Sequence, residues 1–294
     1  MQYLGEILSV VAAILWAFAV ILFKKSGESV HPIALNLFKN IFAMALFIAT
    51  ILILDIQFIQ DLSTTFYLYL FLSGVIGIGV GDTLFLKSLN LLGAGLTGIV
   101  YCLYAPFVII FSVLLLNETL TILQVFGVFL IVLAILIATY KRGKSQIKRE
   151  RILLGILLAI FANIAFATGI VIIKPLLGHT PILWATLIRL IGGIFSLFII
   201  LIFLPERRKI IKSLTIRSSF PYTISGSFIG TYLAMLVWLA GIKYTQVSIA
   251  STLNQTNTIF IFLFASIILK EPIDWKRSTG VLLAILGVAL VTLG

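Results

Sequence analysis

Two short polar stretches interrupt long apolar runs in this sequence, and their side chains are the first candidates for binding chemistry. The stretch VYCLYAP carries Tyr101 and Tyr104, and STLNQTNTIF carries Asn254 and Asn257, 153 residues further on. Each pair is three residues apart, so its side chains share one helix face. Polar groups are costly in hydrocarbon unless they are paired or face a cavity. We therefore expect a cavity for a zwitterionic or polar organic solute. The competing interpretation is that these groups hold helices together.

Charged side chains also lie inside apolar runs. Lys39 and Arg189 each lie roughly two turns inside a hydrophobic segment, where they could attract a substrate carboxylate or guard a pathway electrostatically. As structural groups they would extend to the lipid headgroups or bind a helix-end carbonyl. Asp82 could pair with Lys87, sense protons or lie at the membrane interface. We expect electrostatic or gating roles for Lys39, Arg189 and Asp82, with helix bending near Pro106.

Little in the sequence could catalyse a reaction. His31 and His179 lie near loop prolines, no intramembrane histidine and carboxylate cluster has metal-ligand spacing, and no nucleophile has an identifiable base partner. The glycine-rich SGVIGIGVGD at 73–82 matches neither the dinucleotide nor the Walker spacing, and we expect it to let helices pack closely. The sequence therefore predicts no enzyme, no metal site and no cofactor.

The composition predicts an all-α integral membrane protein. Hydrophobic residues make up 61% of the 294 residues and charged residues only 11%, whereas about a quarter of the residues of soluble domains are charged. The formal net charge of +11 could indicate nucleic acid, but the basic residues gather in short loops, so no nucleic-acid partner is expected. The single cysteine, Cys102, cannot form an internal disulfide. No cleavable leader pattern precedes the first apolar run, which we expect to remain as a helix.

Ten apolar runs approach the length of about 20 residues that a helix needs to cross a bilayer. They are residues 4–23, 33–54, 66–86, 95–116, 121–140, 152–173, 182–204, 219–239, 246–269 and 276–293. We expect each to be a transmembrane helix.

The second half of the chain repeats the pattern of the first. Gly5 aligns with Gly155 and Lys39 with Arg189, while Glu118 aligns with Glu271. We expect one five-helix unit at 1–140, a basic linker at 141–151 and a second five-helix unit at 152–294. Because five is odd, the second unit crosses the membrane in the opposite direction, which gives inverted repeats.

Lysine and arginine near the span ends predict the orientation, because cytoplasmic loops retain them. Most of the basic residues follow the odd-numbered spans, notably in KRGKSQIKRER at 141–151 and PERRKIIKSLTIRSS at 205–219. We expect these connections in the cytoplasm and both termini outside, in a multi-pass protein of the cell (inner) membrane.

Glu118 and Glu271 each follow a predicted span. We interpret them as structural groups at the start of the next helix, where a carboxylate complements the positive end of the helix dipole. Pro272 suits the first turn of such a helix.

The chain resembles the drug/metabolite transporter superfamily, specifically its ten-helix branch built from EamA domains. The resemblance rests on the Leu15–Trp16 pair, the cations Lys39 and Arg189, GDTLFLKSLN at 81–90, and the similar segments 117–137 and 270–291. It implies alternating access around a cavity lined mainly by spans 1, 3, 4, 6, 8 and 9. On those spans, Trp16, Asn163 and Trp238 join the tyrosine and asparagine pairs as candidate substrate-binding residues.

The chain departs from the family pattern in two places. The usual proline of span 4 is Pro106, but the corresponding position in span 9 is Ile259, so the two halves of the cavity should differ. The embedded glutamate of the small multidrug-resistance branch is missing, since that region reads Trp16 and Ala17, so proton-coupled cation antiport is not carried over.

We therefore expect a secondary transporter that exports a small organic metabolite, an amino acid or a related polar or aromatic compound. A flippase for a lipid-linked substrate is the alternative. The expected partners are the small-molecule substrate and the lipid bilayer, and the chain could act as a monomer.

Overall fold

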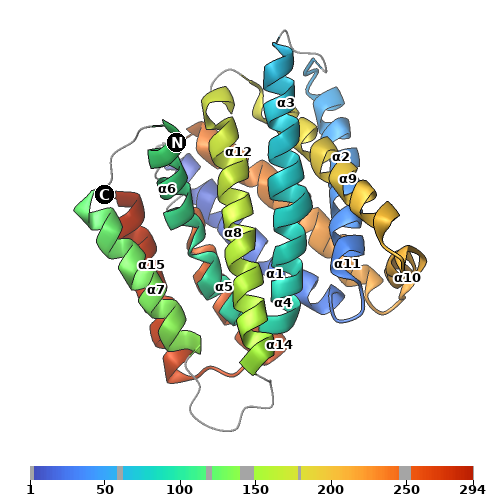
Figure 1. The fold of residues 1–294 in the computed structure, drawn as a ribbon. Coiled ribbons are helices and arrows are strands. Elements are labelled where there is room, and N and C mark those ends of the chain that lie inside the picture. Colours follow the sequence, from blue (N-terminus) through green and yellow to red (C-terminus); the bar gives the residue numbers. More distant parts are fainter. Residues whose placement is uncertain are drawn as a thin grey trace.

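A computed structural model of the chain describes residues 3–57, 62–116, 121–139, 149–177, 180–244 and 253–293. These residues form helices and the turns between them, and no strand occurs in them (Figure 1). The fold class expected from the composition is therefore confirmed as far as helical content is concerned.

The described part of the first half contains eight helical segments. They are α1 (Leu4–Ser26), α2 (Pro32–Ile53), α3 (Thr64–Ser73), the π-helical η1 (Gly74–Gly81), α4 (Asp82–Leu92), α5 (Ala94–Tyr101), α6 (Tyr104–Leu116) and α7 (Ile122–Thr139). Because α3, η1 and α4 follow one another without a gap, they form one long helix (Figure 1).

The described part of the second half contains a similar succession. Its segments are α8 (Arg149–Leu177), α9 (Ile182–Phe203), α10 (Arg207–Lys212), the 3₁₀ turn η2 (Ser213–Thr215), α11 (Phe220–Gly226), the π-helical η3 (Ser227–Ala234), α12 (Met235–Tyr244), α14 (Asn257–Leu269) and α15 (Trp275–Leu293). As in the first half, α11, η3 and α12 run on without a gap.

Several helix boundaries recur at constant distances along the chain. The π-helical segment η3 begins and ends 153 residues after η1, and α15 begins 153 residues after α7. Helices α2 and α9 are both 22 residues long and begin 150 residues apart. Short π-helical stretches are rare and often lie at functional sites. Because η1 and η3 recur at the same distance, we take them as equivalent positions in the two halves of the chain.

Seven of the described helical stretches are long and apolar enough to cross a membrane. Two further apolar helices, Ile122–Ala138 and Asn257–Leu269, are shorter, and residues 245–252 of the predicted span 246–269 lie outside the described residues. The count of ten spans therefore stays a prediction.

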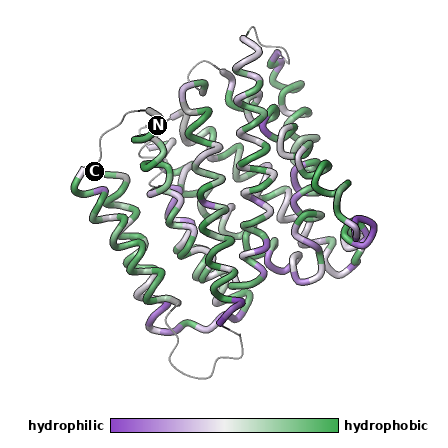
Figure 2. The backbone as a smooth tube through the Cα atoms, viewed as in Figure 1, coloured by the Kyte–Doolittle hydropathy of each residue, from purple (hydrophilic) through white to green (hydrophobic). Residues whose placement is uncertain are grey.

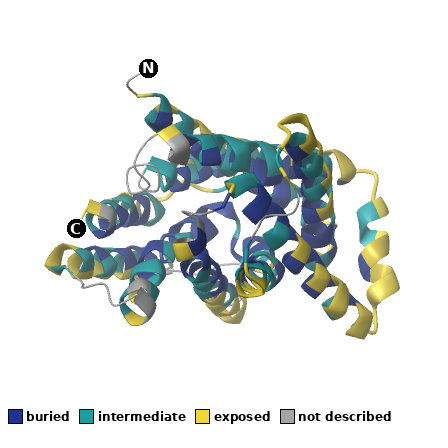
Figure 3. Cartoon of the chain, turned by 90° about the horizontal axis from the view of Figure 1, so that it is seen from above, coloured by how far each residue is buried: buried dark blue, intermediate teal, exposed yellow. Residues whose placement is uncertain are grey.

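The surface of the bundle suits a lipid environment. Large apolar side chains point outward from many helices, among them Leu136, Phe161 and Leu286. Hydrophilic residues gather at one end of the bundle and around α10 (Figure 2). Seen from above, buried residues occupy the inward helix faces and exposed residues the periphery (Figure 3).

Glycines allow two pairs of helices to approach closely. A Cβ atom at Gly74 of η1 would overlap the backbone carbonyl of Arg189 in α9, and one at Gly192 of α9 would overlap that of Phe71 in α3. Gly127 and Gly287 provide the same proximity between α7 and α15, which pack side by side at one edge of the bundle (Figure 1). The expected role of the glycine-rich stretch in close packing is confirmed.

Glu271 caps a helix other than the one expected. Its two carboxylate oxygens accept hydrogen bonds from the backbone nitrogens of Ala94, at 2.7 Å, and Gly95, at 3.1 Å. Glu271 therefore compensates the N-terminus of α5, a helix of the other half of the chain. The expectation that Glu271 stands at the start of the next helix is wrong, and Glu118 lies outside the described residues.

The next helix, α15, uses a different cap. Asp274 directly precedes it, and its Oδ1 accepts from the backbone nitrogen of Arg277 at 2.8 Å. Pro272 lies before the helix rather than in its first turn, so that part of the expectation is also wrong.

Candidate solute-binding cavity

Two helix breaks lie at corresponding positions of the chain. Residues 102 and 103 separate α5 from α6, and residues 255 and 256, found 153 residues later, separate the helical residues 253–254 from α14. Tyr101 and Tyr104 flank the first break, while Asn254 and Asn257 flank the second. Each predicted pair therefore spans an interruption of the helix.

The two breaks have different local causes. In the first, Pro106 has no backbone N–H and cannot bond to the carbonyl of Cys102 four residues earlier. In the second, the position of the proline is Ile259, whose backbone nitrogen donates to Thr256 O at 2.9 Å. The Thr256 hydroxyl donates to Leu253 O at 2.6 Å and so competes with the helical hydrogen bond.

A cavity of about 220 Å³ lies between the helices at these breaks. All four residues that flank the breaks line it, together with Trp16 of α1 and Trp238 of α12. The Tyr101 and Tyr104 rings are stacked, with their centroids 5.9 Å apart and their planes 3° from parallel. Aromatic faces and amide groups from both halves of the chain therefore surround one space, and these can orient a small polar solute.

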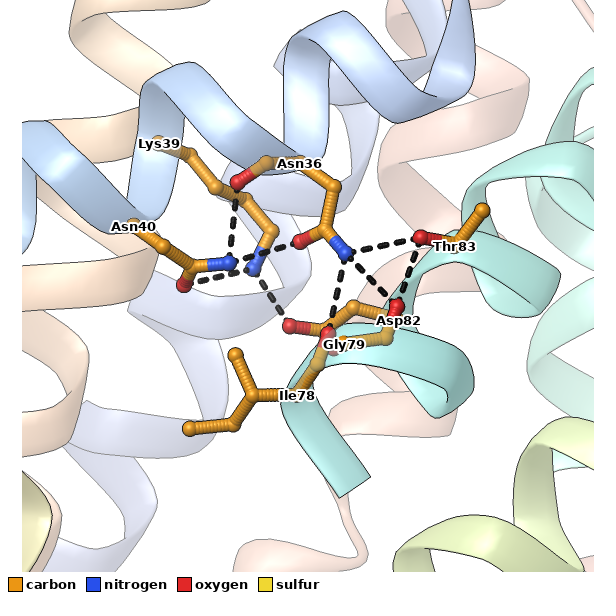
Figure 4. A network of polar contacts seen from close by, with 7 residues as sticks. All are labelled: Asn36, Lys39, Asn40, Ile78, Gly79, Asp82 and Thr83. Atoms are coloured by element: carbon orange, nitrogen blue, oxygen red, sulfur yellow. Dashed lines mark hydrogen bonds and ion pairs between the residues drawn. The ribbon is translucent and has the colours of Figure 1, made fainter. Parts of the chain in front are cut away.

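Lys39 belongs to a hydrogen-bonded network at one wall of this cavity (Figure 4). Its Nζ lies 2.5 Å from Asp82 Oδ2, and the two side chains are only 5% and 14% exposed. The Lys39 ammonium also donates to Asn40 Oδ1 at 3.3 Å. Lys39 does not extend to the lipid headgroups, and Asp82 pairs with Lys39 rather than Lys87.

Asn36 and Asn40 complete the network from α2. Asn36 Nδ2 donates to Ile78 O at 2.9 Å and to Thr83 Oγ1 at 2.9 Å, and Asn40 Nδ2 donates to Asn36 Oδ1 at 2.8 Å (Figure 4). These bonds join α2 to η1 and α4. The sequence analysis did not include either asparagine, although their spacing of four residues places them on one helix face and could have revealed them.

Arg189 lines the same cavity from α9. Its Nε donates to Ser73 Oγ at 3.1 Å, and Ser73 Oγ donates in turn to Leu70 O at 2.9 Å. Among the described residues, Arg189 forms no ion pair with a carboxylate. Its guanidinium is therefore a fixed cation at the cavity wall.

Two predicted site residues do not line the cavity. The Asn163 Nδ2 donates to the backbone oxygens of Ala159, at 2.8 Å, and Val100, at 3.2 Å, so this amide joins α8 to α5. Pro106 is buried in the first turn of α6, directly after the helix break, and is not among the residues that line the cavity. Of the other polar residues of STLNQTNTIF, Ser251 and Thr252 lie outside the described residues.

The cavity also has a lining residue that the sequence analysis missed. Thr231 of η3 contributes a hydroxyl that has no hydrogen-bond partner among the described residues, and the same holds for Trp238 Nε1. No group of three or more histidine, cysteine, aspartate or glutamate side chains in the described residues could hold a metal ion.

The family comparison matches nearly the whole chain. The profile of the EamA-like transporter family matches twice, at residues 3–140 and again at residues 153–293. The chain belongs to the EamA-like transporter family. It is thus a transporter of the drug/metabolite transporter superfamily.

Individual relatives support this EamA assignment. An uncharacterized transporter of Archaeoglobus fulgidus is 23% identical over 287 residues, which cover 98% of this chain and 97% of that protein. A solved crystal structure covers 100% of this chain and 99% of its own with a TM-score of 0.69 and 17% identity, a similarity that shows the fold alone.

Shorter matches involve flippase subunits. Over 58 residues the chain is 43% identical to a probable 4-amino-4-deoxy-L-arabinose-phosphoundecaprenol flippase subunit of an Enterobacter species. The corresponding subunit of Pseudomonas fluorescens is 42% identical over 57 residues. These matches cover 20% and 19% of this chain and about half of each subunit, 54% and 50%.

Proposed function

We propose that this EamA-family protein is a secondary transporter that moves a small organic metabolite by alternating access between two inverted five-helix repeats. The repeats would be residues 1–140 and 152–294, joined by the basic linker 141–151. The recurrence of the π-helical segments at a distance of 153 residues supports this division, as does the double family match. Ten spans in all would make the second repeat enter the membrane from the opposite face.

The observation that carries the proposal is the position of the two helix breaks. Both lie on one cavity, at corresponding positions of the two halves. Discontinuous helices near the bilayer midplane characterise the substrate sites of transporters built from inverted repeats, because a break exposes backbone and side-chain polar groups without exposing them to lipid.

The halves also differ in how their helices are joined, as alternating access requires. In the first half, Asn36 and Lys39 tie α2 to η1 and α4. In the second half, Thr186, which stands in α9 where Asn36 stands in α2, donates within its own helix, to Ile182 O. If the two halves exchanged these arrangements, the cavity would open to one face of the membrane and then to the other.

The solute would be an amino acid or a related polar compound. Tyr101, Tyr104 and Trp16 offer aromatic faces, and Asn254 and Asn257 offer amide donors and acceptors. We favour export across the inner membrane. We favour an orientation with both termini outside, because cytoplasmic loops retain lysine and arginine and most of these residues follow the odd-numbered predicted spans. The short matches to flippase subunits make flipping of a lipid-linked substrate the second candidate.

Counterflow in proteoliposomes tests the proposal. Vesicles loaded with a pool of unlabelled amino acids and related metabolites should accumulate labelled members of the pool, and the accumulation should fall at least about tenfold in Tyr101→Leu/Asn254→Leu, since each lost polar contact contributes about 1 kcal/mol. Unchanged flux in the folded double variant would refute the site. A wild-type protein that moves only lipid-linked substrates would favour the flippase.

A further inference from the structure

The two halves place different chemistry at matching positions around the cavity. Arg189 stands 150 residues after Lys39, at the same place in α9 as the lysine in α2. Position 235, which corresponds to Asp82 through the distance of 153 residues between η1 and η3, is a methionine. The second half therefore keeps the cation but lacks the carboxylate.

The supporting amides are missing in the second half as well. Asn36 and Asn40 correspond to Thr186 and Leu190. The Thr186 hydroxyl donates within its own helix, to Ile182 O at 2.9 Å. Among the described residues, the two asparagines that support the Lys39–Asp82 pair thus have no amide counterpart at the matching positions of α9.

The charge of the cavity follows from this difference. Lys39, Asp82 and Arg189 are the charged residues among the described lining, and Lys39 and Asp82 form an ion pair. The described lining therefore carries a net charge of +1, and Arg189 is its cation that forms no ion pair with a described residue. An unpaired cation inside a membrane protein is costly unless an anion joins it.

Hydrogen-bond donors without partners line the same cavity as this charge. Thr231, Met235 and Trp238 follow one another at helical spacing on η3 and α12, and all three line the cavity. Thr231 is only 8% exposed, and its hydroxyl and the Trp238 indole N–H lack partners among the described residues. A buried donor without a partner indicates an acceptor that the protein itself does not provide.

We propose that Arg189 binds a singly charged oxyanion group of the transported molecule, with Thr231 and Trp238 as additional donors. This inference rests on the proposed function and narrows the substrate class to organic anions and zwitterions. The oxyanion takes the place of the carboxylate that is missing at Met235. A guanidinium binds carboxylate and phosphate oxygens through paired, charge-assisted hydrogen bonds. The group is the carboxylate of a free metabolite or the phosphodiester of a lipid-linked one.

Charged thiol reagents test the site without knowledge of the substrate. In Cys102→Ser/Met235→Cys protein in nanodiscs, the rate of modification by the anionic 2-sulfonatoethyl methanethiosulfonate is compared with that by its cationic trimethylammonioethyl analogue. Each rate is divided by the rate with free cysteine. We expect the anionic reagent to be favoured at least about tenfold, and Arg189→Gln should abolish this preference whereas Arg189→Lys retains it. No preference, or one that survives Arg189→Gln, would overturn the proposal.

Protection experiments then identify the source of the oxyanion. Hexanoate should slow the modification and hexanamide should not, if the site takes a free carboxylate. Slowing by dihexanoyl phosphatidylglycerol alone would place the oxyanion on a lipid-linked substrate. Equal effects of hexanoate and hexanamide, or protection by no anion, would overturn the assignment.

Substitutions of Met235 that introduce no cysteine give an independent test, by measurement of transport. Met235→Asp supplies the missing carboxylate and should reduce counterflow of anionic solutes at least about tenfold, whereas the neutral Met235→Asn should retain the preference for anionic over neutral solutes. Wild-type vesicles that carry neutral solutes as well as anions would overturn this inference while leaving the proposed function intact. Absence of any flux would instead contradict the proposed function.

Discussion

Lys39 and Asp82 satisfy each other's charge in the interior of the bundle, and the asparagines around them satisfy the remaining polar atoms. Such a pair is tolerated in an apolar surrounding because each partner removes the cost of the other. Arg189 differs from Lys39, because its side chain has a hydroxyl partner, Ser73, and no carboxylate partner in the described residues. A buried charged side chain that has an ion-pair partner stabilises the fold, whereas a buried charged side chain without one is available to bind a charged ligand.

A double-mutant cycle tests the stabilising role of the pair. Lys39→Met or Asp82→Leu alone leaves one buried charge unpaired and should lower the free energy of unfolding by about 3–5 kcal/mol. The double variant removes both charges, so its free energy of unfolding should be lower than that of the wild type by no more than half as much as in the single variants. Unfolding in detergent, followed by circular dichroism, measures all four proteins.

Additive effects of the two single substitutions would contradict this account of the pair, since independent residues show no coupling energy. Lys209→Met is a suitable control, because the Lys209–Glu206 pair is exposed and exposed pairs contribute about 0–1 kcal/mol.

At the scale of elements, the contact between η1 and α9 depends on glycine at some positions and not at others. A Cβ at Gly74 would overlap the Arg189 carbonyl, whereas one at Gly77 would have its nearest neighbour, Arg189 Nη2, at 3.7 Å, an ordinary contact distance. Both glycines lie in the same π-helical segment, so they form a matched pair.

Gly74→Ala should therefore force η1 away from α9 and destabilise the protein by about 1–3 kcal/mol. Gly77→Ala should not destabilise the protein, because its Cβ would meet only ordinary contact distances and alanine is favoured over glycine inside a helix by about 0.5–1 kcal/mol. Thermal unfolding of the two variants side by side measures the difference. Equal midpoints would show that the close approach of η1 to α9 does not contribute to stability.

Most helix positions could be predicted from the sequence, but the breaks could not. The expected spans 33–54 and 182–204 agree with α2 and α9 to within one residue, because apolar runs bounded by polar turns define membrane-spanning helices. Hydropathy does not register which backbone hydrogen bonds form, so the expected span 95–116 ran through the break at residues 102 and 103. Pro106 indicated bending there, and nothing comparable marked residues 255 and 256.

The candidate site was predicted in part. Internal comparison of the chain brought the tyrosine and asparagine pairs together, and the structure places both on one cavity. Sequence alone does not fix the rotation of one helix relative to another, so the contact between Lys39 and Asp82 could not be foreseen. For the same reason Asn163, on a helix expected to face the cavity, instead joins α8 to α5.

At the scale of the whole molecule, alternating access requires one cavity to communicate with both sides of the membrane in turn. The helix breaks and the π-helical segments lie at equivalent places in the two halves, so the rearrangement of one half can be mirrored by the other. The single native thiol, Cys102, is 1% exposed and can be replaced by serine for labelling studies.

Two-sided accessibility of a cavity residue tests this central claim most directly. Cys102→Ser/Thr231→Cys protein is placed in right-side-out and in inside-out membrane vesicles, and each is treated with a membrane-impermeant thiol reagent. Alternating access predicts that Cys at position 231 is modified in both preparations, because each molecule opens to one face and then to the other. Modification from one face only, under conditions in which the vesicles carry out counterflow, would contradict the account.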